Sequence, residues 1–146
     1  MLVLKRRHYQ EIVAQAAAAA PKEACGLIAG IEENGRRTVT RVYPLTNLDD
    51  SPEHFSMDPK EQFAAVKDIR NNDWELLGNY HSHPATPARP STEDIRLAFD
   101  PEAIYLIISL VDAQKPVLRA FGIRHGLVSE AEITIVEDEE DGGSRL

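Results

Sequence analysis

Hydrophobic and polar residues follow different periods along the chain, and these periods predict the first elements. Residues 8–20 place apolar side chains on one helical face, and their alanines favour a helix that Pro21 ends. Residues 24–30 form a short apolar run that predicts a strand. Residues 38–45 are rich in β-branched and aromatic residues, and the intervening Asn34-Gly35 is a hairpin turn signal. We therefore expect these two strands to pair antiparallel.

A loop rich in Asn, Asp, Ser and Pro follows at residues 47–52, and then a second helix begins. Asp58 is a suitable N-cap, Pro59 suits the first helical position, and Glu61 stands where a capping box requires an acid. The apolar residues of this helix predict a buried stripe, and Asn71-Asn72-Asp73 ends it. The stripe consists of Phe63, Val66 and Ile69.

The second half of the chain reads as strands with one further helix. The expected order is a strand at 76–83, a proline-rich loop, a helix from Ser91 to about Phe99, and strands at 104–111, 117–123 and 127–136. The run at 104–111 is almost continuously apolar, which is typical of a central strand buried on both faces. The sequence thus predicts one α/β domain over residues 1–136, with a mixed β-sheet flanked by helices.

Composition narrows the possible partners. The 146 residues carry a net charge of −8, which disfavours nucleic acid, and no apolar stretch is long enough for a membrane span. The single cysteine excludes an internal disulfide and a CxxC zinc ribbon, so a cytoplasmic location is expected. Part of the acidity is local, since residues 137–141 are all acidic. We interpret residues 137–146 as an acidic, flexible, solvated tail.

One segment carries residues suited to metal chemistry. His81 and His83 are two apart on a strand, so their imidazoles point to the same side. The proline-rich loop then leads to a helix start where Asp94 can turn back toward them. Two histidines and one carboxylate leave a fourth tetrahedral position open, as in catalytic zinc sites.

Simpler interpretations of the same residues stay open at this point. Two histidines at this spacing also occur by chance, and Ser91 with Asp94 resembles a capping box that would only stabilise a helix. Capping and catalysis do not exclude each other. The coincidence of a histidine pair, a short constrained loop and an acidic helix start favours the metal site.

With an upstream Glu23, the pattern His81-x-His83, seven residues, Ser91, two residues, Asp94 resembles the JAMM (MPN+) metallopeptidase signature. The similarity extends to small stand-alone prokaryotic members through the segments 23–28, 55–59, 78–84 and 105–110. It implies the MPN/JAB fold, an architecture similar to that of cytidine deaminases. All five signature positions match.

The resemblance also implies a role for each residue. His81, His83 and Asp94 would bind one Zn²⁺ with a catalytic water as fourth ligand. Glu23 would act as general base and then general acid, and Ser91 would hydrogen-bond the oxyanion. These roles suit the chemistry, because zinc lowers the pKa of a bound water to about 7 and a glutamate can shuttle its proton.

Other catalytic patterns match less well. The sequence contains no HExxH motif, and one cysteine cannot supply the PCxxC of a zinc deaminase. Cys25 lies in an apolar strand and is expected to be a small buried residue rather than a nucleophile. His8, His54 and His125 are interpreted as surface or loop residues, and Arg89 and Arg96 as solvated.

The resemblance implies a substrate class: a peptide or isopeptide bond after the C-terminal Gly-Gly of a ubiquitin-like protein. The short connection from Asp94 to Ile104 disfavours a linkage-selective deubiquitinase. Compact prokaryotic relatives act on sulfur carriers, either freeing cysteine during cysteine synthesis or trimming the carrier to expose Gly-Gly. The alternative is a non-catalytic MPN scaffold that binds partners. The sequence does not indicate an oligomeric state.

Overall fold

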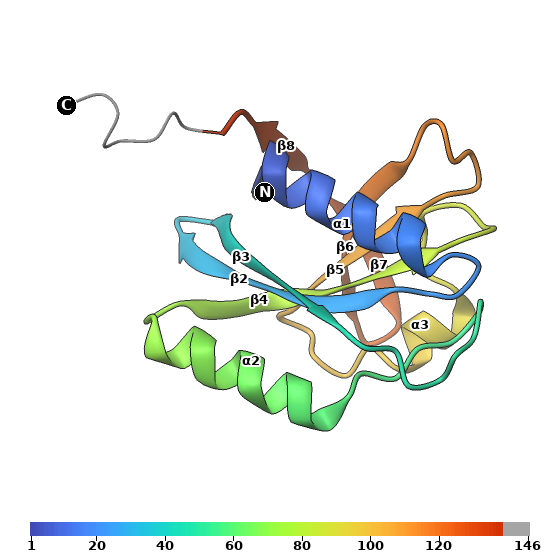
Figure 1. Ribbon diagram of the computed structural model, residues 1–146. Coiled ribbons are helices and arrows are strands. Elements are labelled where there is room, and N and C mark those ends of the chain that lie inside the picture. Colours follow the sequence, from blue (N-terminus) through green and yellow to red (C-terminus); the bar gives the residue numbers. More distant parts are fainter. Residues whose placement is uncertain (139–146) are drawn as a thin grey trace.

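The computed structural model describes residues 1–138, which form eight strands and three helices (Figure 1). The strands are β1 (Leu2–Lys5), β2 (Cys25–Glu33), β3 (Arg36–Leu45), β4 (Glu75–His83), β5 (Ile104–Ser109), β6 (Val117–Arg124), β7 (Leu127–Ala131) and β8 (Ile133–Val136). The helices are α1 (Arg6–Ala19), α2 (Pro59–Asn71) and α3 (Thr92–Arg96). The α/β class and the mixed sheet flanked by helices are confirmed.

All strands belong to one sheet in the order β7-β6-β5-β4-β2-β3-β1-β8. β2 pairs antiparallel with β3, as expected from the Asn34-Gly35 turn, and both turn residues adopt positive φ angles of 51° and 79°. β4 lies between antiparallel β2 and parallel β5, so it is a central strand. The end of β4, with its two histidines, is therefore held by neighbouring strands on both sides.

The sheet is strongly curled. β7 and β8 lie at opposite ends of the strand order, yet Glu132 alone separates them in the sequence. In a flat sheet of eight strands the edges would stand on the order of 30 Å apart, which one residue cannot span. The carbonyl of Glu132 also accepts a hydrogen bond from the N–H of Leu2 at 2.8 Å, which joins this connection to β1.

The two long helices lie on opposite sides of the sheet (Figure 1). α1 packs on β1, β3, β5 and β8, and α2 packs on β3 and β4. The main core joins Ile12 and Ala16 of α1 to buried residues of the strands, including Tyr80 of β4. A smaller cluster of Ala88, Ile107 and Phe121 lies apart from this core. Within the described residues, no helix is long and apolar enough to cross a membrane.

Several details of α2 differ from the sequence prediction. Asp58 caps the helix by accepting from the N–H of Lys60, as expected. Glu61 does not complete a capping box, because its carboxylate accepts from the N–H and hydroxyl of Thr46 instead. The side of α2 that faces the sheet buries Ala65 and Ile69, whereas Phe63 is 66% exposed. The predicted stripe was therefore wrong at Phe63, whose ring lies beside the Lys67 ammonium.

Other corrections concern the ends of the chain and the third helix. β1 was not expected from the sequence, and the predicted strand 127–136 is divided into β7 and β8. α3 ends at Arg96 instead of continuing to Phe99. His8, expected at the surface, is buried, and burial lowers its pKa.

The first two residues of the acidic segment 137–141 form hydrogen bonds with α1. Glu137 binds Arg6 through the Nε of the guanidinium at 3.0 and 3.1 Å. The carboxylate of Asp138 accepts from the N–H of Arg7 at 3.1 Å. Glu137 and Asp138 are thus bound to the start of α1. The rest of the predicted tail, residues 139–146, lies outside the described residues.

Candidate metal centre

The end of β4 presents its two histidines on one side and a serine on the other. His81 and His83 are both buried. Between them, Ser82 points away and accepts a hydrogen bond from the N–H of Ala24 at 2.7 Å, while its own N–H donates to the Ala24 carbonyl at 3.0 Å. These bonds tie the start of β2 to the histidine segment. Glu23 is thereby placed beside the histidines.

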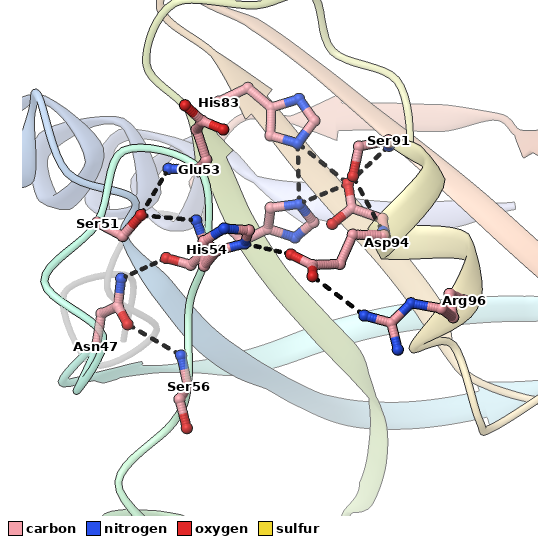
Figure 2. Close-up of polar contacts among 11 residues, drawn as sticks. Asn47, Ser51, Glu53, His54, Ser56, His83, Ser91, Asp94 and Arg96 are labelled. Carbon is pink, nitrogen blue, oxygen red and sulfur yellow. Dashed lines mark hydrogen bonds and ion pairs between the residues drawn. The ribbon is translucent and has the colours of Figure 1, made fainter.

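The carboxylate comes from the first turn of α3. Ser91 is the N-cap, and its hydroxyl oxygen accepts from the N–H of Asp94 at 3.0 Å. The Oδ2 of Asp94 in turn accepts from the N–H of Ser91 at 2.9 Å, which completes a capping box. The same Asp94 oxygen faces both histidines (Figure 2). The capping box therefore fixes the orientation of Asp94.

Three ring and carboxylate atoms converge. Nε2 of His81, Nε2 of His83 and Oδ2 of Asp94 are each 3.1 Å from the other two. His83 holds its Nδ1 2.9 Å from the Pro87 carbonyl, which assigns the proton to Nδ1 and leaves a lone pair on Nε2. Three lone pairs at such distances repel one another unless a proton or a metal cation lies between them. The residues present therefore fit a divalent metal, and the donor set suits zinc.

In the metal-free protein, the contacts within the cluster shift the pKa values of Asp94 and His83. Burial opposes ionisation of Asp94, but hydrogen bonds from His81 and His83 hold its pKa well below the usual range. Burial likewise opposes protonation of His83. Its bonds to Asp94 and to the Pro87 carbonyl nevertheless raise its pKa above the usual value. A positive charge on His83 is thus favoured beside Asp94 in the metal-free protein.

Glu23 lies next to this cluster, between α1 and β2, and is only 4% exposed. Its Oε1 is buried and has no hydrogen-bond partner among the described residues. Burial raises the pKa of Glu23 to about 8, although the charge on nearby His83 acts in the opposite direction. A buried carboxyl with a free oxygen beside a metal-binding cluster is suited to exchange a proton with a bound molecule.

The structure also brings in residues that the sequence did not single out. Phe55 stacks on His81 with ring centroids 4.7 Å apart. His54 pairs through Nδ1 with Glu93 of α3, and that contact raises the pKa of His54 (Figure 2). Glu93 also binds Arg96, which is thus paired and not simply solvated. The contacts of Phe55 and His54 join the loop 47–57 to β4 and α3, so sequence spacing gave no signal for them.

A cavity of about 400 Å³ opens beside the cluster. Its wall includes His81 and Asp94, and most of the rest is apolar, from Leu27, Met57, Leu97, Tyr105 and Ile107 among others. An apolar cavity next to a metal-binding group gives room for a substrate chain and reduces its contact with water.

The remaining sequence candidates lie elsewhere or are inert. Cys25 is fully buried, and burial raises the pKa of its thiol to about 12, so it cannot supply a thiolate near neutral pH. His125 is exposed in the turn between β6 and β7. Arg89 is exposed, as expected.

Comparison with known proteins identifies the family of the chain. The family described as prokaryotic homologs of the JAB domain matches residues 5–123. A protein from Mycobacterium tuberculosis named CysO-cysteine peptidase is 36% identical, over 94% of this chain and 92% of its own. A Thermus thermophilus protein named probable TtuB-protein conjugate cleaving protease is 40% identical over 67% of this chain and 64% of its own.

Solved structures show the same fold. The solution structure of a Desulfitobacterium hafniense protein, 58% identical, covers 96% of both chains with a TM-score of 0.88. The crystal structure of a JAB1/MPN domain protein from Archaeoglobus fulgidus, 22% identical, covers 94% of this chain and all of that one with a TM-score of 0.60. The resemblance to the JAMM (MPN+) proteins is confirmed. The chain belongs to the prokaryotic JAB family.

Proposed function

We propose that this protein is a zinc-dependent peptidase that hydrolyses the peptide or isopeptide bond after the C-terminal Gly-Gly of a ubiquitin-like sulfur-carrier protein. The observation that carries the proposal is the convergence of three acceptor atoms, from His81, His83 and Asp94, beside the buried Glu23. Relatives named as a peptidase and as a conjugate-cleaving protease support it. A single cysteine suits a reducing cytoplasm.

The ligands would be His81, His83 and Asp94, where zinc supplies Lewis acidity and lowers the pKa of a water toward neutrality. Glu23 takes the proton of the attacking water, for which its free oxygen is available, and then delivers it to the leaving amine. The pKa of about 8 in the metal-free protein suits the second step, in which the protonated carboxyl delivers its proton. A bound Zn²⁺ would lower that pKa and so favour the carboxylate that the first step needs.

Ser91 is assigned to the carbonyl oxygen of the substrate. Its Oγ already accepts a hydrogen bond from the N–H of Asp94. A hydroxyl that accepts through a lone pair still has its O–H to donate. Ser91 can thus cap α3 and stabilise the charge that develops on the oxygen in the transition state.

The names of several relatives support the proposed substrate class. One relative is named CysO-cysteine peptidase, and others are named desampylase or probable TtuB-protein conjugate cleaving protease. We infer a carrier with an extended Gly-Gly tail, from which cysteine or a short peptide is released. Extended tails are commonly bound by strand addition beside a sheet, and glycines allow close approach to backbone.

Intact-mass spectrometry tests this function on a carrier extended by cysteine or a short peptide after Gly-Gly. We expect cleavage after Gly-Gly by the zinc-loaded wild type and loss of roughly 100-fold or more of the rate in Glu23→Gln. His83→Ala should lose both zinc and activity. A wild type that binds zinc but leaves every such carrier intact would contradict the proposal and favour a non-catalytic scaffold.

A further inference from the structure

One side chain organises the loop between β3 and α2. The Nδ2 of Asn47 donates to the carbonyls of Glu23 and His54, each at 3.0 Å. Its Oδ1 accepts from the N–H groups of Asp49 and Ser56, each at 2.9 Å. Figure 2 shows two of these four bonds, those that join Asn47 to His54 and Ser56. Both donor hydrogens of the amide are thus used, and its oxygen accepts twice.

The same loop also binds the backbone N–H of Glu23. The N–H of Glu23 donates to the carbonyl of Ser51 at 2.9 Å. Ser51 is itself fixed, because its hydroxyl accepts from the N–H groups of Glu53 and His54. Asn47 and Ser51 therefore bind the carbonyl and the N–H of Glu23, whose carboxyl is buried beside the histidine cluster.

The far side of this loop lies against the metal-binding residues. Phe55 stacks on His81, and His54 pairs with Glu93 next to Asp94. The hydrogen bonds of Asn47 go to Glu23, His54, Asp49 and Ser56, and none joins it to a candidate ligand within residues 1–138. Asn47 can therefore affect Glu23 and the loop while leaving the three ligand atoms where they are.

We propose that Asn47 is a positioning residue for the hydrolysis, and that its amide nitrogen fixes the backbone of Glu23 relative to the loop 47–57. The proposal rests on the function given above, since it concerns the placement of the proton-transferring carboxyl. Displacement of a reacting group by about 1 Å can lower a rate by about 100-fold. A residue that holds both backbone and loop is thus expected to matter for turnover.

A merely structural role makes a different prediction. Asn47 accepts from the N–H of Asp49 two residues on, which is an Asx turn, and aspartate forms this turn equally well. Asn47→Asp keeps both acceptor bonds of the oxygen but replaces the two N–H donors by a carboxylate oxygen facing two carbonyls. If Asn47 shaped the loop only through its oxygen, this variant would behave as wild type.

The experiment compares Asn47→Asp and Asn47→Ala with wild type on the extended carrier. We expect kcat to fall about 10- to 100-fold in both variants, with zinc affinity, measured by competition with a chelator, changed less than about twofold because no ligand is touched. Asn72→Asp is the matched control. It removes an equivalent Nδ2 bond, to the Asp68 carbonyl, at the other end of β4, and it should keep full turnover.

A readout independent of turnover keeps this inference separate from the proposed function. Amide hydrogen exchange of Glu23, in the zinc-free protein, should be about tenfold faster in Asn47→Asp, as expected when hydrogen bonds that hold a segment are lost. Exchange of Ile28, inside the β2–β4 ladder, should be unchanged. Unaltered exchange at Glu23, or wild-type kcat in Asn47→Asp, would overturn the positioning role. Loss of cleavage in wild type would instead overturn the function alone.

Discussion

At the scale of the residue, Glu23 combines properties that ordinary glutamates lack. Its side chain is buried, its Oε1 has no partner among the described residues, and burial raises its pKa to about 8. In the metal-free protein the carboxyl is therefore mostly neutral at pH 7. A neutral buried acid tolerates an apolar setting that would strongly destabilise a carboxylate.

This state predicts how the stability of the metal-free protein depends on pH. The folded pKa of Glu23 lies above its unfolded value of 4.5, so the stabilisation is complete below pH 4.5 and is lost as pH rises toward about 8. Between these values the folded state binds the extra proton, with a slope of up to about 1.4 kcal/mol per pH unit. Urea unfolding with a chelator present, at several pH values, measures this dependence.

Glu23→Gln is the control, because glutamine keeps the shape of the side chain but does not titrate. From about pH 5 to 8, the free energy of unfolding of wild type should fall steadily relative to that of Glu23→Gln. Above about pH 8 the difference should level off. If the two curves run parallel, Glu23 is ionised in the folded protein and its assigned protonation state is wrong.

The residues of the cluster could be found from the sequence because their spacing is local. His81 and His83 share a strand face by the period of two, and Asp94 follows a short proline-containing loop to a helix start. Asn47 and Phe55 could not be found in this way. They act through contacts with segments 24 and 26 residues away, which only the folded chain creates.

At the scale of the element, α1 begins with unfavourable charges. Lys5, Arg6 and Arg7 stand at its start, where the helix dipole favours acids, and Lys5 provides no side-chain cap. The carboxylate of Asp138 accepts from the N–H of Arg7, and Glu137 pairs with Arg6. The beginning of the acidic segment thus supplies, from the other end of the chain, the cap and the charge that α1 lacks.

Truncation separates this cap from the rest of the acidic segment. A chain ending at Val136 should lose about 0.5–2 kcal/mol of stability, which is the usual effect of removing an N-cap. The loss should shrink at high salt, because Arg6 and Glu137 are exposed. Urea unfolding measures both effects.

A chain ending at Asp138 is the matched control, since it keeps both acids that contact α1. It should unfold at the same urea concentration as the full chain, and both truncated chains should keep their turnover. Equal stability of the two truncated chains would show that Asp138 and Glu137 contribute nothing to α1.

Elements with local signals were predicted well, and those that depend on packing were not. The caps and turns at Asn34-Gly35, Asp58 and Ser91 are formed as expected, because each depends on neighbouring residues. The buried face of α2 depends on how the helix lies on β3 and β4. That placement buries the small Ala65 and exposes Phe63, which hydrophobicity alone would not indicate.

At the scale of the whole molecule, the order of the strands is a long-range property. The almost continuous apolar run at residues 104–111 correctly indicated that β5 lies inside the sheet, with a strand on each side. Nothing local indicates that the last strand, β8, returns to pair with the first, β1, at the opposite edge from β7. This return closes the curl of the sheet around α1, which contacts β1, β3, β5 and β8.

The candidate metal centre joins separate parts of this architecture. Two candidate ligands lie at the end of the central β4, and the third lies on α3 beyond the proline-rich loop. The folded protein holds the three candidate ligand atoms close together, whereas the unfolded chain does not. A metal ion that binds them therefore stabilises the folded state by mass action.

Zinc should consequently raise the stability of the wild type by about 2.7 kcal/mol when free zinc is 100 times its dissociation constant. Glu23→Gln should show the same gain, because Glu23 is not among the three ligand residues. His83→Ala should show almost none. Asp94→Asn should lose the gain and also be less stable without zinc, since part of its capping box with Ser91 is weakened. Thermal unfolding with zinc or chelator measures all four proteins. Equal zinc stabilisation of His83→Ala and wild type would place the metal elsewhere and remove the basis of the proposed chemistry.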